Sequence, residues 1–290
     1  ISSLAVGTTT IDNYAASADC SSTLSCLAEL GVKFERAGAV VRIEGTGIRG
    51  FRAPSVQLDC GNSGTTMRLI TGILAGQRFE SSLVGDASLS KRPMRRVIGP
   101  MAAMGGTIDA DDGHAPLRIH GNPGLKGFEH TLSIASAQIK SCILLAGLHA
   151  EGTTIVHEPT PTRDHTERML RWFGAVVESE NGSISINGGQ TLTARDLSVP
   201  CDISAAAFFL VAAACLSGSD LTLVNVGLNP TRTGIIDVLI DLGVDLAILN
   251  EREVCNEPVG DLTVRGRRGP LGSDSNIVRG GIIANLIDEI

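Results

Sequence analysis

A glycine- and hydroxyl-rich segment, residues 59–68, has the residue types expected of a small-anion site. It reads Asp-Cys-Gly-Asn-Ser-Gly-Thr-Thr-Met-Arg. Gly61 and Gly64 would let a ligand approach the backbone closely, because glycine has no Cβ, and the amide and hydroxyl side chains add donors. The apolar run that follows, 67–74, predicts a helix whose free N–H groups point at this turn and attract negative charge.

A cluster of cations follows a short distance along the chain. Residues 91–96 contain four basic side chains, although the net charge of the whole chain is -7. Such a local reversal of charge favours an anion site over a merely solvated face. Arg92 precedes Pro93, which we expect in the first turn of a helix, so that the guanidinium is held at a fixed angle toward a carboxylate or phosphate. The other three, Lys91, Arg95 and Arg96, are interpreted as solvated or structural.

Composition excludes several classes of function. Aromatic residues make up 3% of the chain and its pI is about 5.4, which argues against binding of nucleic acid. The seven cysteines are scattered and the six histidines form no ligand pattern, so we expect reduced cysteines, no metal and no cofactor. No signal peptide and no membrane-spanning run are found, so a cytoplasmic protein without a membrane partner is expected.

One order of features recurs four times along the chain. An extended segment after Gly7, Gly76, Gly152 or Gly218 is followed by an amphipathic helix that ends near a glycine, and then by an alternating strand. The four helices are expected at 24–30, 94–104, 167–173 and 234–242. Segments 136–148 and 205–216 are apolar nearly all round, which is typical of buried helices. The pattern predicts an α/β fold of repeated βαβαββ units around buried helices.

Five segments, taken in order, make the chain similar to the 5-enolpyruvylshikimate-3-phosphate synthases, the enolpyruvyl transferases of the shikimate pathway. They are residues 61–68, 85–94, 136–141, 162–168 and 286–290. The resemblance covers the whole chain. It implies a transferase of aromatic amino-acid biosynthesis whose substrates are phosphoenolpyruvate and shikimate 3-phosphate.

The resemblance also assigns substrate-binding residues. Those implied at the phosphoenolpyruvate end are Asn62, Gly64 and Arg92. Those implied for shikimate 3-phosphate are Ser136, Ala137, Gln138, Thr162 and Arg163, with Thr162 in a position that is often serine in the family. Ser136 and Gln138 also suit this role by their chemistry, because a hydroxyl and an amide stand beside the free N–H groups of a predicted helix.

Asp288 is the catalytic residue that the resemblance implies. It lies in the segment Asn-Leu-Ile-Asp-Glu-Ile, and in the family the matching acid helps to remove the proton from the 5-hydroxyl of shikimate 3-phosphate. The neighbouring Glu289 is one residue out of place for this motif. Sensitivity to glyphosate is also implied, because Gly64 leaves the room that an alanine would fill, although Leu69 stands where many relatives have proline.

On the family pattern, residues 1–199 are expected to form a three-repeat domain without its extreme N-terminal segment. Residues 200–290 are expected to form a partial second domain with one repeat and the start of the next. Residues 1–7 match the end of a buried helix. Several lysine- and arginine-bearing segments of the family have no match in the sequence. We therefore expect a chain truncated at both ends, inactive alone, that associates with a complementary fragment or is a monomer when complete.

Three other readings are open at this point. A UDP-N-acetylglucosamine enolpyruvyl transferase would share the repeat, but it usually has a cysteine in the loop before its Arg-Pro, and Gly85–Pro93 has none. An RNA 3′-phosphate cyclase is disfavoured by the acidic balance and the scarcity of aromatic residues. The third is a non-catalytic fragment that retains part of a binding surface.

Overall fold

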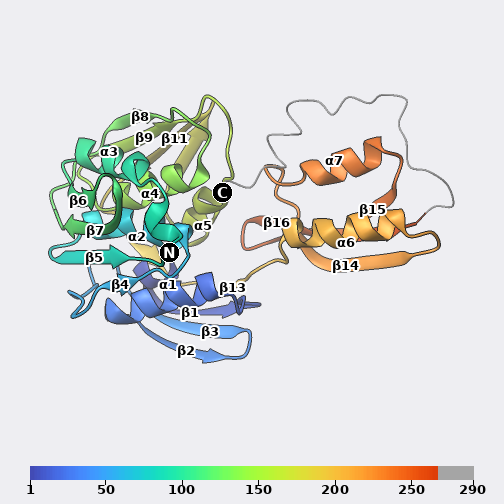
Figure 1. Ribbon diagram of the computed structural model, residues 1–290, viewed down its shortest axis with the longest axis horizontal. Helices are drawn as coiled ribbons and strands as arrows, with labels where there is room; N and C mark the ends of the chain where they lie inside the picture. The colour runs from blue at the N-terminus through green and yellow to red at the C-terminus, as the bar shows by residue number, and fades with distance from the viewer. Residues whose placement is uncertain (267–290) are drawn as a thin grey trace. The chain divides into compact units, whose positions relative to one another are not determined.

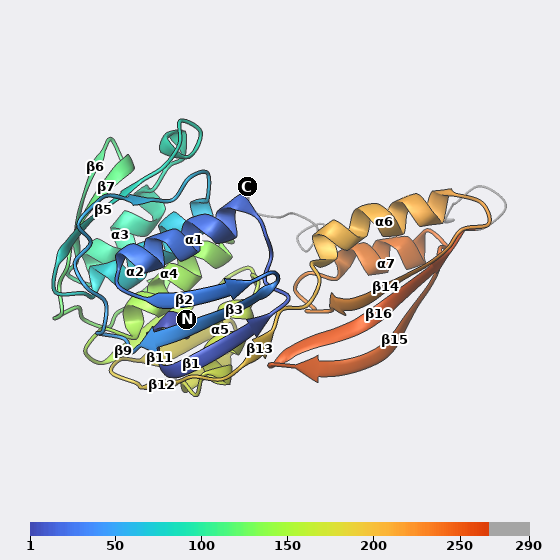
Figure 2. The same ribbon diagram turned by 90° about the horizontal axis from the view of Figure 1, so that it is seen from below.

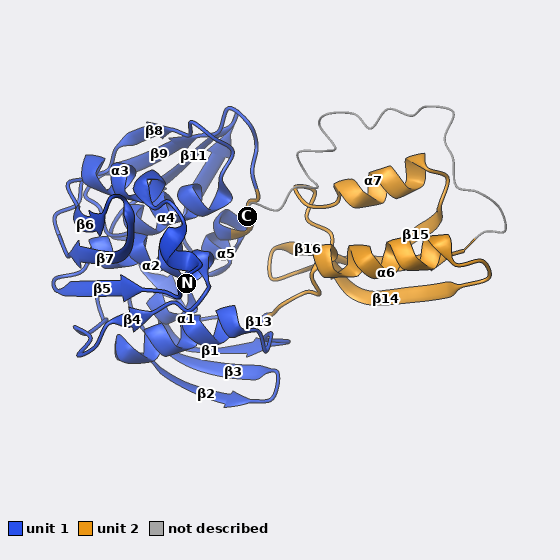
Figure 3. Cartoon of the chain, viewed as in Figure 1, with its two compact units in different colours: residues 1–162, 166–197 blue, residues 163–165, 198–290 orange. Residues whose placement is uncertain are grey.

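The structure is a computed structural model that describes residues 1–266. It is an α/β fold with mixed sheets (Figure 1). Contacts divide the chain into two units, residues 1–162 with 166–197 and residues 163–165 with 198–290 (Figure 3).

Three small sheets of the first unit have the same strand order. In each, one strand is followed by a helix and then by two antiparallel strands. The last of these three strands lies between the other two in the sheet. The first sheet has β1 (Ala5–Asp12), α1 (Ala18–Glu29), β2 (Lys33–Ala37) and β3 (Val40–Thr46). The second has β5 (Glu80–Val84), α3 (Arg95–Ala103), β6 (Thr107–Asp111) and β7 (His114–His120). The third has β9 (Thr153–His157), α5 (His165–Trp172), β10 (Val177–Glu180) and β11 (Ser183–Asn187).

Short parallel strands extend these sheets. β12 (Leu192–Thr193) pairs with β1, β4 (Leu58–Asp59) with β5, and β8 (Glu129–Thr131) with β9. β13 (Leu197–Ser198) also pairs with β1. The short 3-10 helices η1 (Ser2–Leu4) and η2 (Leu89–Lys91) lie before β1 and before α3.

Two helices form the centre of the first unit. α2 (Gly64–Ala75) packs against α4 (Ala137–Gly147), with α2 beside β5 and β7 and α4 beside β9 and β11 (Figure 2). Their backbones approach so closely that a Cβ built on Gly72 would lie 2.2 Å from the Cys142 carbonyl oxygen. Every residue of α4 except Gln138 is buried, as its apolar sequence predicts.

The second unit is a single helix-covered sheet in the described residues. β14 (Asp220–Gly227), β16 (Glu257–Arg265) and β15 (Asp245–Val254) lie in that order, and α6 (Ile203–Cys215) and α7 (Gly234–Asp241) lie on the same side of them (Figure 2). Leu210 of α6, Leu239 of α7 and Leu262 of β16 are part of the core between the helices and the sheet.

Most predicted elements are present, and the helices end shortly before the glycines that were predicted to stop them. α1, α3, α5 and α7 are each followed within two residues by a glycine with positive φ, at Gly31, Gly105, Gly174 and Gly243. This left-handed conformation carries no Cβ penalty in glycine, so a glycine is a reliable stop signal for a helix.

Three expectations are wrong in the described structure. Residues 1–7 do not end a buried α-helix, since Ser2–Leu4 form η1 and Ala5 begins β1. Pro93 lies before the first turn of α3, which begins at Arg95. The 205–216 segment is helical but not buried all round, because α6 leaves Phe208 80% and Phe209 60% exposed.

None of the helices within residues 1–266 has the length and apolar character needed to cross a membrane.

Candidate anion-binding site

The candidate site forms where α2 and α4 begin side by side. Ser63 caps α2 by accepting a hydrogen bond from the Thr66 N–H (3.1 Å), and Ser136 caps α4 by accepting one from the Ile139 N–H (3.4 Å). The Gln138 amide joins the two starts, since its Nε2 donates to Thr65 Oγ1 over 2.8 Å. Two helix N-termini therefore lie together, and the positive end of each helix dipole attracts negative charge.

The glycine-rich turn brings Arg92 to the same place. Arg92 Nη2 donates to Asn62 Oδ1 over 2.9 Å, and Asn62 Nδ2 donates to Asp86 Oδ2 over 2.8 Å. Because the Asn62 NH2 group faces a carboxylate, its oxygen is the atom turned toward Arg92. The guanidinium is thus positioned by Asn62 and by the Arg92 N–H bond to the Leu89 carbonyl (2.9 Å) at the end of η2, rather than by Pro93.

Asp86 anchors this arrangement. Its Oδ1 accepts hydrogen bonds from the backbone N–H groups of Leu89 (2.7 Å) and Ser88 (2.9 Å). These bonds, the one from Leu89 first, together with the Asn62 amide and the nearby charge of Arg92, hold the pKa of Asp86 below its ordinary value. Asp86 therefore stays ionised at neutral pH and keeps Asn62 oriented.

Two guanidinium groups converge at Gly64. A Cβ added there would lie 3.2 Å from Arg92 Nη1 and 3.3 Å from Arg68 Nη1. Arg68 also donates to Gln138 Oε1, so it connects the two helix starts. Arg68 was not among the predicted site residues, although its position four residues after Gly64 places it on the same face of α2.

A chain of contacts connects Thr162 to the first turn of α4. Its hydroxyl donates to Glu158 Oε1, and the other oxygen of Glu158 is 3.0 Å from the Nζ of Lys140 in α4. Arg163 belongs to the second unit. Asp288 lies outside the described residues. The structure therefore brings together Asn62, Gly64, Arg92, Ser136, Ala137, Gln138 and Thr162.

The arrangement suits binding of small anions. Arg68 and Arg92 supply fixed charge that can pair with a carboxylate or phosphate, and the two helix starts add the positive ends of their dipoles. Within residues 1–266, no group of three histidine, cysteine or acidic side chains is placed to hold a metal ion.

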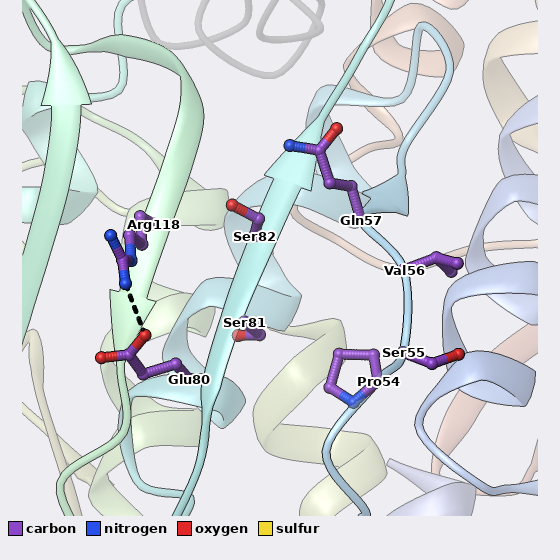
Figure 4. Close-up of a pocket in the computed structure, with 8 residues that line it drawn as sticks. All are labelled: Pro54, Ser55, Val56, Gln57, Glu80, Ser81, Ser82 and Arg118. Carbon is purple, nitrogen blue, oxygen red and sulfur yellow. Dashed lines mark hydrogen bonds and ion pairs between the residues drawn. The ribbon is translucent and has the colours of Figure 1, made fainter.

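A separate hollow of about 380 Å³ lies away from these residues. The ion-paired Arg118 and Glu80 line one side of it and the segment Pro54–Gln57 the other, with Ser81 and Ser82 of β5 between them (Figure 4). None of the residues predicted to bind substrate lines it, so it contributes nothing to the candidate site.

Comparison with known proteins identifies the family. The chain matches the EPSP synthase (3-phosphoshikimate 1-carboxyvinyltransferase) family over residues 1–289. It is 51% identical to the 3-phosphoshikimate 1-carboxyvinyltransferase of Methylococcus capsulatus over 92% of this chain and 62% of the relative. The corresponding protein of Geobacillus kaustophilus is 51% identical over 100% of this chain and 67% of the relative.

A solved structure agrees with the sequence comparison. The EPSP synthase of Acinetobacter baumannii has a TM-score of 0.87 and 48% identity, over 92% of this chain and 60% of that protein. The chain thus spans about three fifths of the length of most of these relatives. From the family match and the shared fold, the chain belongs to the EPSP synthase family.

Proposed function

We propose that the protein carrying this chain transfers the enolpyruvyl group of phosphoenolpyruvate to the 5-hydroxyl of shikimate 3-phosphate. In this reaction the hydroxyl oxygen bonds to C2 of phosphoenolpyruvate and gives up its proton while C3 takes up a proton, which forms a tetrahedral intermediate. Loss of a proton from C3 then expels phosphate and restores the double bond. The reaction is a step of aromatic amino-acid biosynthesis. The observation that carries the proposal is the convergence of Arg68 and Arg92 on Gly64, beside the adjoining starts of α2 and α4.

The roles proposed for the individual residues are those that the family resemblance implies. Arg92, oriented by Asn62, pairs with the phosphate or carboxylate of phosphoenolpyruvate, which lies over Gly64. Ser136, Ala137 and Gln138 at the start of α4 bind shikimate 3-phosphate, together with Thr162 and Arg163. A phosphate suits this position because the positive end of a helix dipole, a hydroxyl and an amide meet there.

Asp288 is proposed to take part in removal of the proton from the attacking hydroxyl. In the full-length gene product, Asp288→Asn should lower kcat by about 10²-fold or more, because a general base contributes about that much, while binding of shikimate 3-phosphate is retained. Calorimetric binding and steady-state kinetics on the same preparation test this. Retained kcat would remove Asp288 from the mechanism.

The remaining proposals concern the cellular location, the assembly and cofactor requirement of the protein, and its inhibition by glyphosate. The protein is proposed to act in the cytoplasm and without a cofactor, either with a complementary fragment or as a monomer when complete. Glyphosate is proposed to compete with phosphoenolpyruvate in the space over Gly64. A matched Gly64→Ala variant, in which the new methyl group would lie 3.2 Å from Arg92 Nη1, should be less sensitive to glyphosate than the unsubstituted enzyme.

The central test is phosphate release by the full-length gene product with both substrates. Arg92→Ala should lower kcat/KM for phosphoenolpyruvate by at least about tenfold, equivalent to ~1.4 kcal/mol. Arg96→Ala is the matched control, since Arg96 is an exposed arginine of α3, and it should change kcat/KM by less than about twofold.

Two outcomes would contradict the proposal. Equal kinetics of the Arg92 and Arg96 variants would remove Arg92 from the site. Turnover with UDP-N-acetylglucosamine in place of shikimate 3-phosphate would assign the protein to the other enolpyruvyl transferase.

A further inference from the structure

Lys140 is a charged residue in the first turn of the mostly apolar helix α4, and its side chain is fully buried, with 0% exposed. Burial of an ammonium group is costly unless it is paired and hydrogen-bonded. Its Nζ lies 3.0 Å from Glu158 Oε2 and 2.6 Å from Glu167 Oε1, and both carboxylates are themselves nearly buried. One cation therefore holds two acids inside the protein.

The two acids lie at the two ends of one connection. Glu158 directly follows β9, and Glu167 is in the first turn of α5. The residues between them read Pro-Thr-Pro-Thr-Arg-Asp-His-Thr, which includes Thr162 and Arg163. Lys140 thus fixes both ends of the connection that carries two of the proposed shikimate 3-phosphate ligands.

Further contacts tie the same connection to α4. Thr162 donates to the second oxygen of Glu158, and Ser141 Oγ is 2.6 Å from Thr166 Oγ1. Glu158 is also held by its N–H bond to the Gly182 carbonyl (2.7 Å). The connection is therefore attached to α4 next to the turn that begins with Ser136.

Lys140 belongs to that first turn, since its N–H donates to the Ser136 carbonyl over 3.1 Å. The other proposed ligands of shikimate 3-phosphate, Ser136, Ala137 and Gln138, are therefore on the same turn as the lysine. The ammonium is buried and engaged by two carboxylates, so it is placed to set the positions of these ligands and not to touch a substrate.

We propose that Lys140 is a positioning residue of the shikimate 3-phosphate site, which holds the 158–167 connection in register with the start of α4. This inference rests on the proposed function. It predicts a specific loss of affinity for one of the two substrates, because Arg92, Asn62 and Gly64 lie in a different segment and do not depend on the connection. The ammonium acts through Glu158 and Glu167.

The test is steady-state kinetics of Lys140→Met in the full-length gene product. Methionine has a similar length and removes the charge. We expect KM for shikimate 3-phosphate to rise at least about tenfold, while KM for phosphoenolpyruvate and kcat at saturation change by less than about threefold. A purely structural role would lower the active fraction, and therefore the apparent kcat, without changing either KM.

A matched control and a second variant keep the test decisive. Lys126→Met removes an exposed lysine that pairs with Glu151, and it should leave both KM values unchanged. If Lys140→Met does not fold, the triple variant Lys140→Met, Glu158→Gln, Glu167→Gln removes all three charges with little change in volume, and the same split in KM is expected.

The outcomes separate this inference from the proposed function. If the unsubstituted enzyme turns over both substrates but the Lys140 variants keep the original KM for shikimate 3-phosphate, the positioning role is overturned and the proposed function stands. If the unsubstituted enzyme does not turn over these substrates, both are overturned.

Discussion

α4 and α6 are two helices of similar apolar sequence that have opposite surroundings. In α4 every residue except Gln138 is buried. In α6 five residues are buried, while Phe208, Phe209 and Val211 are exposed. An apolar helix is expected to be buried on all sides, and only α4 meets that expectation in the described residues.

The difference follows from the neighbours of each helix. α4 packs against α2, α3, β9 and β11, which approach it from several sides. α6 packs mainly against β14 and β16, which lie on one side of it (Figure 2). Hydrophobicity therefore predicts which surface benefits from burial, but the topology decides whether a partner is present to bury it.

The largest expected effect comes from the closest contact of α4. Gly72→Ala would place a Cβ 2.2 Å from the Cys142 carbonyl oxygen, and because that atom belongs to a buried backbone, α4 itself must move. The free energy of unfolding should fall by more than about 3 kcal/mol, or the protein should fail to fold. Urea unfolding followed by circular dichroism measures this.

Gly99→Ala in α3 is the control, because an added Cβ there has no atom within 4 Å. It should change the free energy of unfolding by less than about 1 kcal/mol, because the usual helical gain of alanine over glycine is offset by the restriction that Pro100 places on the residue before it. A loss below about 1 kcal/mol for Gly72→Ala would mean that α2 and α4 can separate easily, and the comparison with α6 would lose its basis.

Local chemistry explains how much of the fold could be predicted from the sequence. Stop signals such as Gly31 and Gly174 act through their own φ angles, so the helix ends before them were predictable. The exposure of Phe208 was not predictable, because it depends on elements that are distant in the sequence. The start of β1 at Ala5 was also missed, since a short apolar run does not distinguish a strand from a helix.

The candidate site likewise contains residues that could be predicted from the sequence and residues that could not. Asn62 and Arg92 were selected because they lie in a recognisable motif, and the structure brings them within 2.9 Å. Arg68 is in the same motif but was not predicted, because its role depends on the helical geometry that places it on the same face of α2 as Gly64. The pairing of Lys140 with Glu158 and Glu167 could not be predicted, since no spacing rule links a lysine in one helix to acids beyond the next strand.

A second prediction concerns His149, which follows the end of α4 and is 1% exposed. Burial first, and then the charge of Arg49, lowers its pKa to about 4. Because the folded pKa lies below the ordinary value of about 6.5, the unfolded chain binds the proton more tightly, and stability present above about pH 6.5 is lost as the pH falls toward 4. The expected loss is about 3 kcal/mol.

Comparison with His149→Leu isolates this contribution. Leucine cannot take up a proton, so the stability of the variant should fall less between pH 7 and pH 4 than that of the unsubstituted protein. Urea unfolding at several pH values gives both curves. Parallel curves would show that His149 titrates normally and that the end of α4 is open to water.

The third prediction tests the buried side of α6. Leu210 is 0% exposed within the core of the second unit. Leu210→Ala should cost about 2 kcal/mol, the low end of the range for a buried leucine, because α6 is covered on one side and can relax into the cavity. Thermal unfolding of the second unit measures it. A cost near 5 kcal/mol would show that α6 is held as rigidly as α4.

The smallest effect is expected on the exposed side of α6. The double substitution Phe208→Ser, Phe209→Ser should change the free energy of unfolding by less than about 0.5 kcal/mol, because the two rings are 80% and 60% exposed. It should also reduce self-association in sedimentation experiments, since an exposed apolar patch favours association. Asp241→Ser, at an exposed position of α7, is the control and should leave association unchanged. A loss of more than about 2 kcal/mol in the double variant would mean that both rings are packed in solution. In that case α4 and α6 would not differ in burial.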